Sequence, residues 1–257
     1  MEKRRYDRID KMPGVLRYIV NDNQFSIGAD TACASIAFQG VFFMTFAPTP
    51  TEVIEGVKWE KDVLGIGKIF WNGWKKDVST TDETFQNLTD IVNIPGVEPF
   101  LRRMGKRTEL RGPMFTIPPD EHNRMVFHLM TKEMSEQMVR ETLYVRLEES
   151  LQQMQNIAIK TQKENEEVCG HTTAIIFHGG LTLSLYSHSD GTFIVYDSHG
   201  IRSPRGKSSL FRCPSVSATK GIIRGLMSTG PSSSPTGPSN YYNICIFASP
   251  LYQKEWT

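Results

Sequence analysis

The hydrophobic pattern of the chain is most regular between residues 171 and 200. Three short strand-like runs follow one another there, separated by Gly179-Gly180 and by Asp190-Gly191. Such dipeptides are strong hairpin signals, because they accept the backbone conformations that tight turns require. The segment therefore predicts an antiparallel meander, and its last run leads into the sequence Tyr-Asp-Ser-His-Gly.

Two helices are predicted elsewhere in the chain, one from a 3.6-residue period and one from a cap signal. Apolar residues recur on one face from residue 131 to 167, among Glu, Gln, Lys and Arg, and we expect a long helix there. Its methionines could form a recognition surface, but a core-packing helix is the favoured interpretation. A second helix is predicted from Ala32, with Asp30 or Thr31 as N-cap and small residues that allow close packing. The apolar positions of the long helix are Met134, Met138, Leu147, Leu151, Met154 and Ala158.

The remaining segments are assigned from composition and turn residues. The charged residues 1–14 predict a loose tail, and residues 15–257 predict a single domain. Helices combined with antiparallel strands place this domain in the α+β class. The other expected elements are a short strand at 15–20, a helix at 217–227, a flexible Gly/Ser/Pro loop at 228–240 and a final strand at 241–252.

Composition narrows the class of protein. The net charge of +1 over 257 residues gives no reason to expect a nucleic acid or membrane partner. The four cysteines are widely spaced without a CxxC pair, which favours a reducing compartment and argues against a structural zinc site. The basic N-terminus has no apolar core behind it, and no apolar run approaches a membrane span. We expect a monomer of the cytoplasm that needs no metal or cofactor.

Asp197 and His199 are the leading candidates for acid–base chemistry. Side chains two apart on a strand share a face, so this pair would point the same way at the end of the sheet. An acid beside an imidazole orients and charges a general base, so a nucleophile opposite the pair would indicate a hydrolase. Ser198 would point to the opposite face and cannot be that nucleophile. The alternative is a satisfied surface pair at a turn.

Cys33 is the leading nucleophile. It lies at the predicted helix start, where free N–H groups and the helix dipole favour a thiolate. The alternative is an ordinary small buried side chain. The amide of Gln24 or Asn23, in the polar loop before Cys33, could donate to a tetrahedral oxyanion, with the Cys33 backbone N–H as second donor. Plain hydrogen bonding within the loop is the alternative role for Gln24.

These residues resemble a known family. A cysteine opening a helix, followed much later by an apolar meander and Tyr-Asp-Ser-His-Gly, resembles the deubiquitinating domain of herpesvirus large tegument proteins and the related tegument-like deubiquitinases found outside herpesviruses. The resemblance is tight over residues 171–211, which include HGGLTLSLYS and RGKSSLF, and looser over 20–46 and 62–70.

The resemblance implies roles for individual residues. It implies Cys33 as nucleophile, His199 as base, Asp197 as the group that orients the imidazole and Gln24 as oxyanion donor. The chain departs from the family in two ways, because Ala32 stands where the family usually has Gln before the cysteine, and the spacing from Gln24 to Cys33 is short for the family. The implied fold is a papain-like cysteine protease variant, with helices packed on an antiparallel sheet.

The implied function is thiol-dependent hydrolysis of the isopeptide or peptide bond after the C-terminal Gly of ubiquitin or polyubiquitin. The thin end of ubiquitin needs a narrow groove, which Gly179, Gly180 and Gly200 could line. A viral protein of this kind would act in the cytoplasm of the host cell. The alternatives are another papain-like viral or cellular cysteine protease, and a catalytically inactive ubiquitin-binding module.

Overall fold

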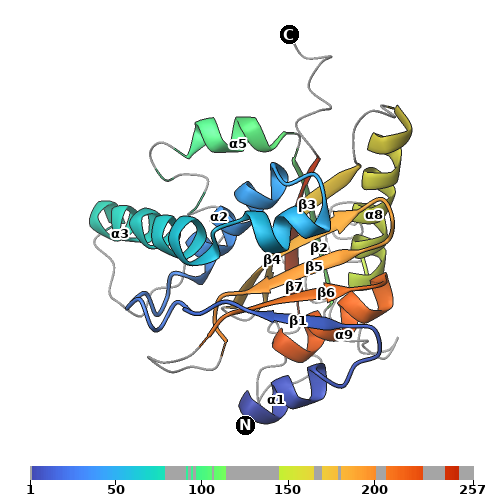
Figure 1. Ribbon diagram of the computed structural model, residues 1–257. Helices are drawn as coiled ribbons and strands as arrows, with labels where there is room; N and C mark the ends of the chain where they lie inside the picture. Colours follow the sequence, from blue (N-terminus) through green and yellow to red (C-terminus); the bar gives the residue numbers. More distant parts are fainter. Residues whose placement is uncertain are drawn as a thin grey trace, which may run out of the picture.

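An antiparallel sheet runs through the middle of the protein (Figure 1). The computed structural model describes residues 2–78, 91, 94, 97–105, 107–113, 145–164, 170–178, 181–200, 207–227 and 241–248. Within these residues the sheet has seven strands in the order β1-β6-β5-β4-β3-β7-β2, and all neighbours are antiparallel. The strands are β1 (Leu16–Ile19), β2 (Arg107–Pro113), β3 (His171–His178), β4 (Leu181–His188), β5 (Phe193–Asp197), β6 (Ser209–Cys213) and β7 (Tyr241–Ala248).

The predicted meander is confirmed. Strands β3, β4 and β5 pair in sequence order, and β6 continues the series on the other side of β5. The final strand β7 lies between β3 and the edge strand β2. Every residue of β5 is buried, which is the pattern of a strand covered on both faces.

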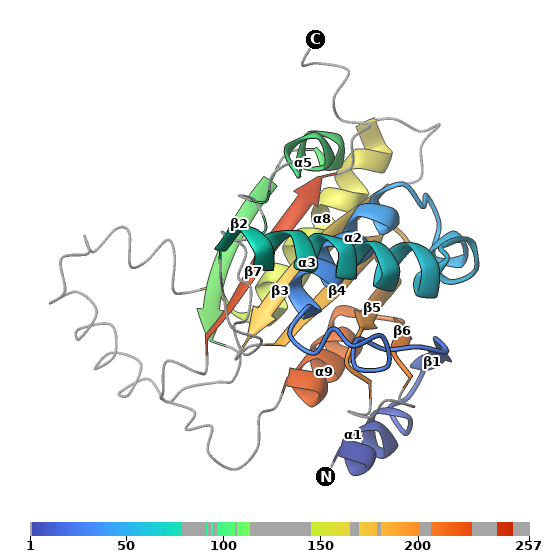
Figure 2. The same ribbon diagram turned by 90° about the vertical axis from the view of Figure 1, so that its left-hand side faces the viewer.

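Helices cover both faces of the sheet, as expected for an α+β protein (Figures 1 and 2). One face carries α2 and α3 with the π-helical segments η1 and η2, and α5 packs beside α2. The other face carries α8 and α9, and α1 packs on α9. The helical elements are α1 (Glu2–Ile9), α2 (Cys33–Thr45), η1 (Glu52–Gly56), η2 (Trp59–Gly65), α3 (Ile66–Val78), α5 (Glu98–Met104), α8 (Leu147–Glu164) and α9 (Val216–Met227).

Helix α2 lies directly on the sheet because its residues are small on the contacting side. The Ser184 hydroxyl of β4 donates a hydrogen bond to the carbonyl of Ala37 at 2.9 Å. A Cβ added to Gly40 would lie 2.5 Å from the same hydroxyl oxygen, so only glycine fits there. The predicted helix start is right, but Asp30 and Thr31 do not cap it. The N-cap residue is Ala32, which makes no side-chain capping bond.

Helix α8 is the described part of the helix that the sequence predicted over 131–167. Its Leu151, Met154 and Ala158 are fully buried, so the apolar stripe packs on the core. For Met154 the core-packing interpretation is therefore confirmed, and the recognition-surface alternative is wrong. Met134 and Met138 lie outside the described residues, as does the Gly/Ser/Pro loop at 228–240.

The prediction of a loose tail over residues 1–14 is wrong. Residues 2–9 form α1, and its Tyr6 and Ile9 are buried at 3% and 2% exposure. The segment is highly charged, yet it forms an amphipathic helix. Its buried side chains Tyr6 and Ile9 lie three residues apart and face the core beside α9. The N-terminal residues therefore belong to the packed structure.

Candidate active site

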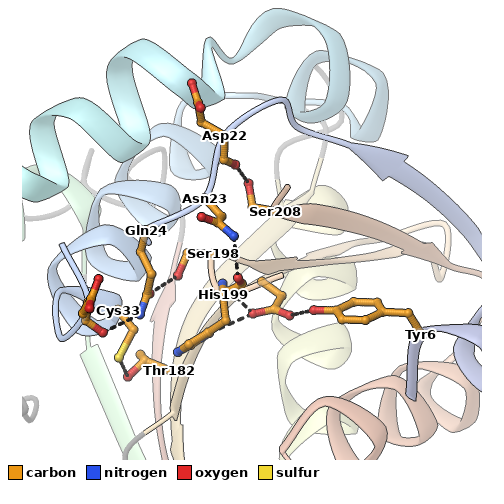
Figure 3. Close-up of polar contacts among 11 residues, drawn as sticks. Tyr6, Asp22, Asn23, Gln24, Cys33, Thr182, Ser198, His199 and Ser208 are labelled. Carbon is orange, nitrogen blue, oxygen red and sulfur yellow. Dashed lines mark hydrogen bonds and ion pairs between the residues drawn. The ribbon is translucent and has the colours of Figure 1, made fainter. Parts of the chain in front are cut away.

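Asp197 and His199 form an ion pair at the end of β5 (Figure 3). The Asp197 Oδ1 atom accepts hydrogen bonds from His199 Nδ1 at 2.8 Å and from the His199 backbone N–H at 3.0 Å. Strand alternation is not the reason for this pairing, because β5 ends at Asp197. The chain instead turns over the carboxylate, and this local Asp bond to a backbone N–H two residues on brings the imidazole back to the acid.

Gly200 makes this turn possible. Its φ of 55° lies in the left-handed region, which glycine adopts without steric cost. A Cβ at this position would also overlap the backbone of Lys207. The glycine that the sequence assigned to a substrate groove therefore has a demonstrable role in the backbone of the site. Gly179 and Gly180 lie outside the described residues.

Asp197 remains ionised despite its burial. Burial alone would raise its pKa, but hydrogen bonds from His199 and Tyr6, together with the His199 charge, hold the pKa below its usual range. Tyr6 donates its hydroxyl to Asp197 Oδ2 at 2.5 Å. The carboxylate thus has a donor on each oxygen, as a buried charge requires.

His199 is charged at neutral pH. Burial acts to lower its pKa, but the hydrogen bond to Asp197 and the side chain of Cys33 outweigh this effect and raise the pKa to about 10. The imidazole is 14% exposed, so a substrate can reach it. Phe25 lies beside the ring, at 6.4 Å between centroids. The site therefore holds an imidazolium between a carboxylate and a thiol.

Cys33 is the first residue of α2 and faces the mouth of the sheet. Its sulfur lies 3.7 Å from the Thr182 hydroxyl at the start of β4, within hydrogen-bond range for sulfur. Figure 3 shows the His199 ring pointing toward these two side chains. Three elements, α2, β4 and the end of β5, thus converge on the thiol, which lies in the first turn of α2 at the positive end of the helix dipole.

Gln24 joins the site through the loop between β1 and α2. Its carboxamide oxygen accepts a bond from Ser198 Oγ at 3.0 Å, and its Nε2 donates to the Asp30 carbonyl at 2.8 Å. Its backbone N–H donates to the Ser198 carbonyl at 3.1 Å. These bonds fix the carboxamide in the loop that leads to Cys33, and the bond to Asp30 uses one of its two N–H donors.

Asn23, the other amide considered for the oxyanion, has a structural role. Its Nδ2 donates to the His199 carbonyl at 3.0 Å, and its Oδ1 accepts from the Ser26 backbone N–H at 2.8 Å. It clamps the loop to the turn that carries the imidazole. Gln24 therefore stays the better oxyanion candidate.

The other cysteines differ from Cys33. Cys213 and Cys245 are buried in the two cores, and burial raises the pKa of both thiols, that of Cys213 to about 12. Both are therefore protonated and inert, and Cys169 lies outside the described residues.

Sequence analysis missed two residues of this site, Tyr6 and Thr182. Tyr6 is 191 positions from Asp197, and no local motif links them. Thr182 comes shortly after the Gly179-Gly180 dipeptide in the sequence, and its only signal is a position at the start of the strand that neighbours β5.

The described ranges lack two further types of site. Those ranges contain no group of three or more His, Cys, Asp or Glu placed to hold a metal ion. Nor does any described helix have the length and apolarity to cross a membrane.

Comparison with known proteins gives a structural likeness alone. No protein-family model matches the chain, and no curated protein matches it by sequence. Among solved structures it resembles the ubiquitin-specific protease encoded by murine cytomegalovirus tegument protein M48, in complex with a ubiquitin-based suicide substrate. The TM-score is 0.56 at 13% identity, over 90% of this chain and 84% of that chain. This degree of likeness shows a shared fold.

Proposed function

We propose that the protein is a cysteine-type deubiquitinase. The observation that carries the proposal is the arrangement of Cys33, His199 and Asp197 at one end of the sheet. The fold shared with a viral ubiquitin-specific protease supports ubiquitin as the substrate class. A nucleophile at the start of a helix that packs on an antiparallel sheet, with base and acid supplied by the sheet, also supports a papain-like architecture.

The first half of the reaction forms a thioester. The Cys33 thiolate attacks the carbonyl carbon of the last Gly of ubiquitin, and the carbonyl oxygen becomes an oxyanion. The second N–H of the Gln24 carboxamide and the backbone N–H of Cys33 donate to this oxyanion. When the C–N bond breaks, His199 transfers its proton to the leaving lysine amine.

The second half releases ubiquitin. Neutral His199 takes a proton from a water molecule, which attacks the thioester carbonyl. The C–S bond breaks, the thiolate is restored beside the imidazolium, and ubiquitin leaves with a free carboxylate. Asp197 stays ionised throughout and holds Nδ1 of His199, so that Nε2 faces the reacting atoms.

We also propose a substrate groove beside His199. Ubiquitin ends in a thin Leu-Arg-Gly-Gly tail, which needs a narrow, glycine-tolerant groove. The half-buried Phe25 beside His199 would form one wall of that groove. Gly200 would lie at its base, and Gly179 and Gly180 are proposed to continue it.

The test is hydrolysis of a ubiquitin–fluorophore conjugate together with labelling by a ubiquitin-based suicide probe. The wild type is expected to turn over the conjugate and to form an adduct at Cys33, located by mass spectrometry. Cys33→Ala is expected to abolish both, while Cys213→Ala keeps both. Turnover by Cys33→Ala would refute the assignment of the nucleophile. A wild type that processes a general peptide substrate but neither ubiquitin reagent would refute ubiquitin specificity.

A further inference from the structure

We infer that Tyr6 of the N-terminal helix is a positioning residue for the Asp197–His199 pair, an inference that rests on the function proposed above. Tyr6 and Asp197 lie 191 positions apart, yet the Tyr6 hydroxyl donates to Asp197 Oδ2 at 2.5 Å in a buried setting. Figure 3 shows Tyr6 reaching the carboxylate from the side opposite His199.

The two oxygens of Asp197 have different partners. Among the described residues, Oδ1 accepts hydrogen bonds from the ring Nδ1 and the backbone N–H of His199. Oδ2 accepts from Tyr6. A carboxylate bonded on one oxygen can rotate about its Cβ–Cγ bond, whereas donors on both oxygens fix its plane. The Tyr6 bond therefore keeps Oδ1 on Nδ1 and keeps the imidazole aimed at Cys33.

Two neighbours, Phe211 and Arg17, hold the Tyr6 ring. Its ring stacks on Phe211 of β6, with 6.3 Å between centroids and 15° between planes. The Arg17 guanidinium of β1 lies over the Tyr6 ring, 4.3 Å from its centroid. Arg17 is tied in turn to Ser209 Oγ at 3.0 Å and to Asp10 at 3.2 Å. Such support is what a group needs in order to position another group within a fraction of an ångström.

Charged groups lie on two sides of the Asp197 carboxylate. His199 supplies the adjacent positive charge, and Cys33 lies beyond it. On the other side the Arg17 charge lies over the Tyr6 ring and is paired with Asp10. Removing the Tyr6 hydroxyl changes no charge, but it leaves Oδ2 buried without this donor and makes protonation of Asp197 easier.

The test is Tyr6→Phe in the full chain, with Tyr18→Phe as the matched control. Phenylalanine keeps the ring stack on Phe211 and loses only the hydroxyl. Tyr18 is half-buried and packs against the core on the opposite face of the sheet. With the ubiquitin–fluorophore conjugate, Tyr6→Phe is expected to lower kcat about tenfold with KM unchanged, the effect of one lost bond to a buried charged group. The acid limb of its pH–rate profile is expected to move up by about half a pH unit or more.

A second readout needs no ubiquitin. The rate of Cys33 alkylation by iodoacetamide, followed by mass spectrometry across pH, should show the same displacement of the acid limb in Tyr6→Phe and none in Tyr18→Phe. If the wild type fails to hydrolyse ubiquitin conjugates, the proposed function falls, and the alkylation profile still decides the role of Tyr6. An unchanged alkylation profile overturns the inference. A lowered melting temperature with unchanged kcat and pH profile also overturns it, because the role would then be structural alone.

Discussion

At the scale of single residues, burial and hydrogen bonding oppose each other on His199. Burial disfavours the charged imidazole, while Asp197 and Cys33 favour it, and the net result is a pKa of about 10. Hydrogen bonds from His199 and Tyr6, with the His199 charge, keep Asp197 ionised. Each side chain of the pair thus helps to stabilise the charged form of the other, and removing either member leaves the other as a buried charge with fewer partners.

This coupling predicts a pH dependence of stability. The folded-state pKa of His199 lies above its ordinary value near 6.5, so the folded state binds the extra proton between these two values. The contribution to the free energy of unfolding is therefore complete below about pH 6.5 and is lost as the pH rises toward 10. Urea denaturation of the wild type and His199→Gln from pH 6 to 10 is expected to show their difference shrinking with pH. A difference that stays constant would contradict the raised pKa.

At the scale of elements, the position of Cys33 depends on how closely α2 approaches β4. The Ala37 carbonyl accepts from Ser184, and Gly40 leaves no room for a side chain at the same contact. The loop before α2 is also tethered from outside, because Lys68 of α3 donates to the Ile27 carbonyl and Glu60 of η2 accepts from the Asn21 N–H. These contacts hold α2 and the loop before it together at the end of the sheet.

The packing of α2 predicts opposite effects for two glycine substitutions. Gly40→Ala would push α2 away from Ser184 and is expected to lower the free energy of unfolding by about 1–3 kcal/mol. Gly73→Ala is the matched control, because Gly73 lies in α3 with open space around its Cβ position. It is expected to raise the free energy of unfolding by about 0.5–1 kcal/mol. Chemical denaturation measures both free energies of unfolding. An unchanged value for Gly40→Ala would show that the contact between α2 and Ser184 has room for a methyl group.

At the scale of the whole molecule, the candidate site combines residues from both ends of the chain. Tyr6 comes from the first helix, Cys33 from the helix after it, and His199 from beyond residue 190. Strand β1 makes this possible, because it pairs with β6 and so brings the N-terminal segment next to β5. The helix α1 then fills the face beside α9, where Gly221 and Gly225 leave room for Met12 and Ile9.

The N-terminal segment is therefore expected to contribute to stability. Deleting residues 1–12 removes the buried Tyr6 and Ile9 and uncovers part of α9, which should lower the free energy of unfolding by about 3 kcal/mol or more. Arg8→Ala, at an exposed position of the same helix, is the control and should stay within about 0.5 kcal/mol of the wild type. Thermal or urea unfolding separates the two. A deletion variant as stable as the full chain would mean that α1 does not stabilise the fold.

Much of the sheet and part of the site are predictable because their signals are local. Glycine dipeptides mark the hairpins, apolar alternation marks the strands, and a cysteine at a helix start with Asp-x-His at a strand end marks the chemistry. These patterns depend on neighbours a few positions apart, so a single sequence contains them. The same reasoning gave the wrong cause for the Asp197–His199 pairing, which arises from a turn and not from strand alternation.

Tertiary structure alone decided which distant groups meet. The hydrogen bond from Tyr6 to Asp197, the hold of Ser198 on Gln24 and the approach of Thr182 to Cys33 each join segments more than 140 positions apart. A charged N-terminal segment has the composition of a tail, and only the sheet order that places β1 beside β6 gives α1 a surface to cover. Local sequence patterns thus determined much of the sheet and the candidate chemistry. Packing between elements decided which residues become partners. Contacts between distant segments are stabilised only when the whole sheet and both helical layers are assembled.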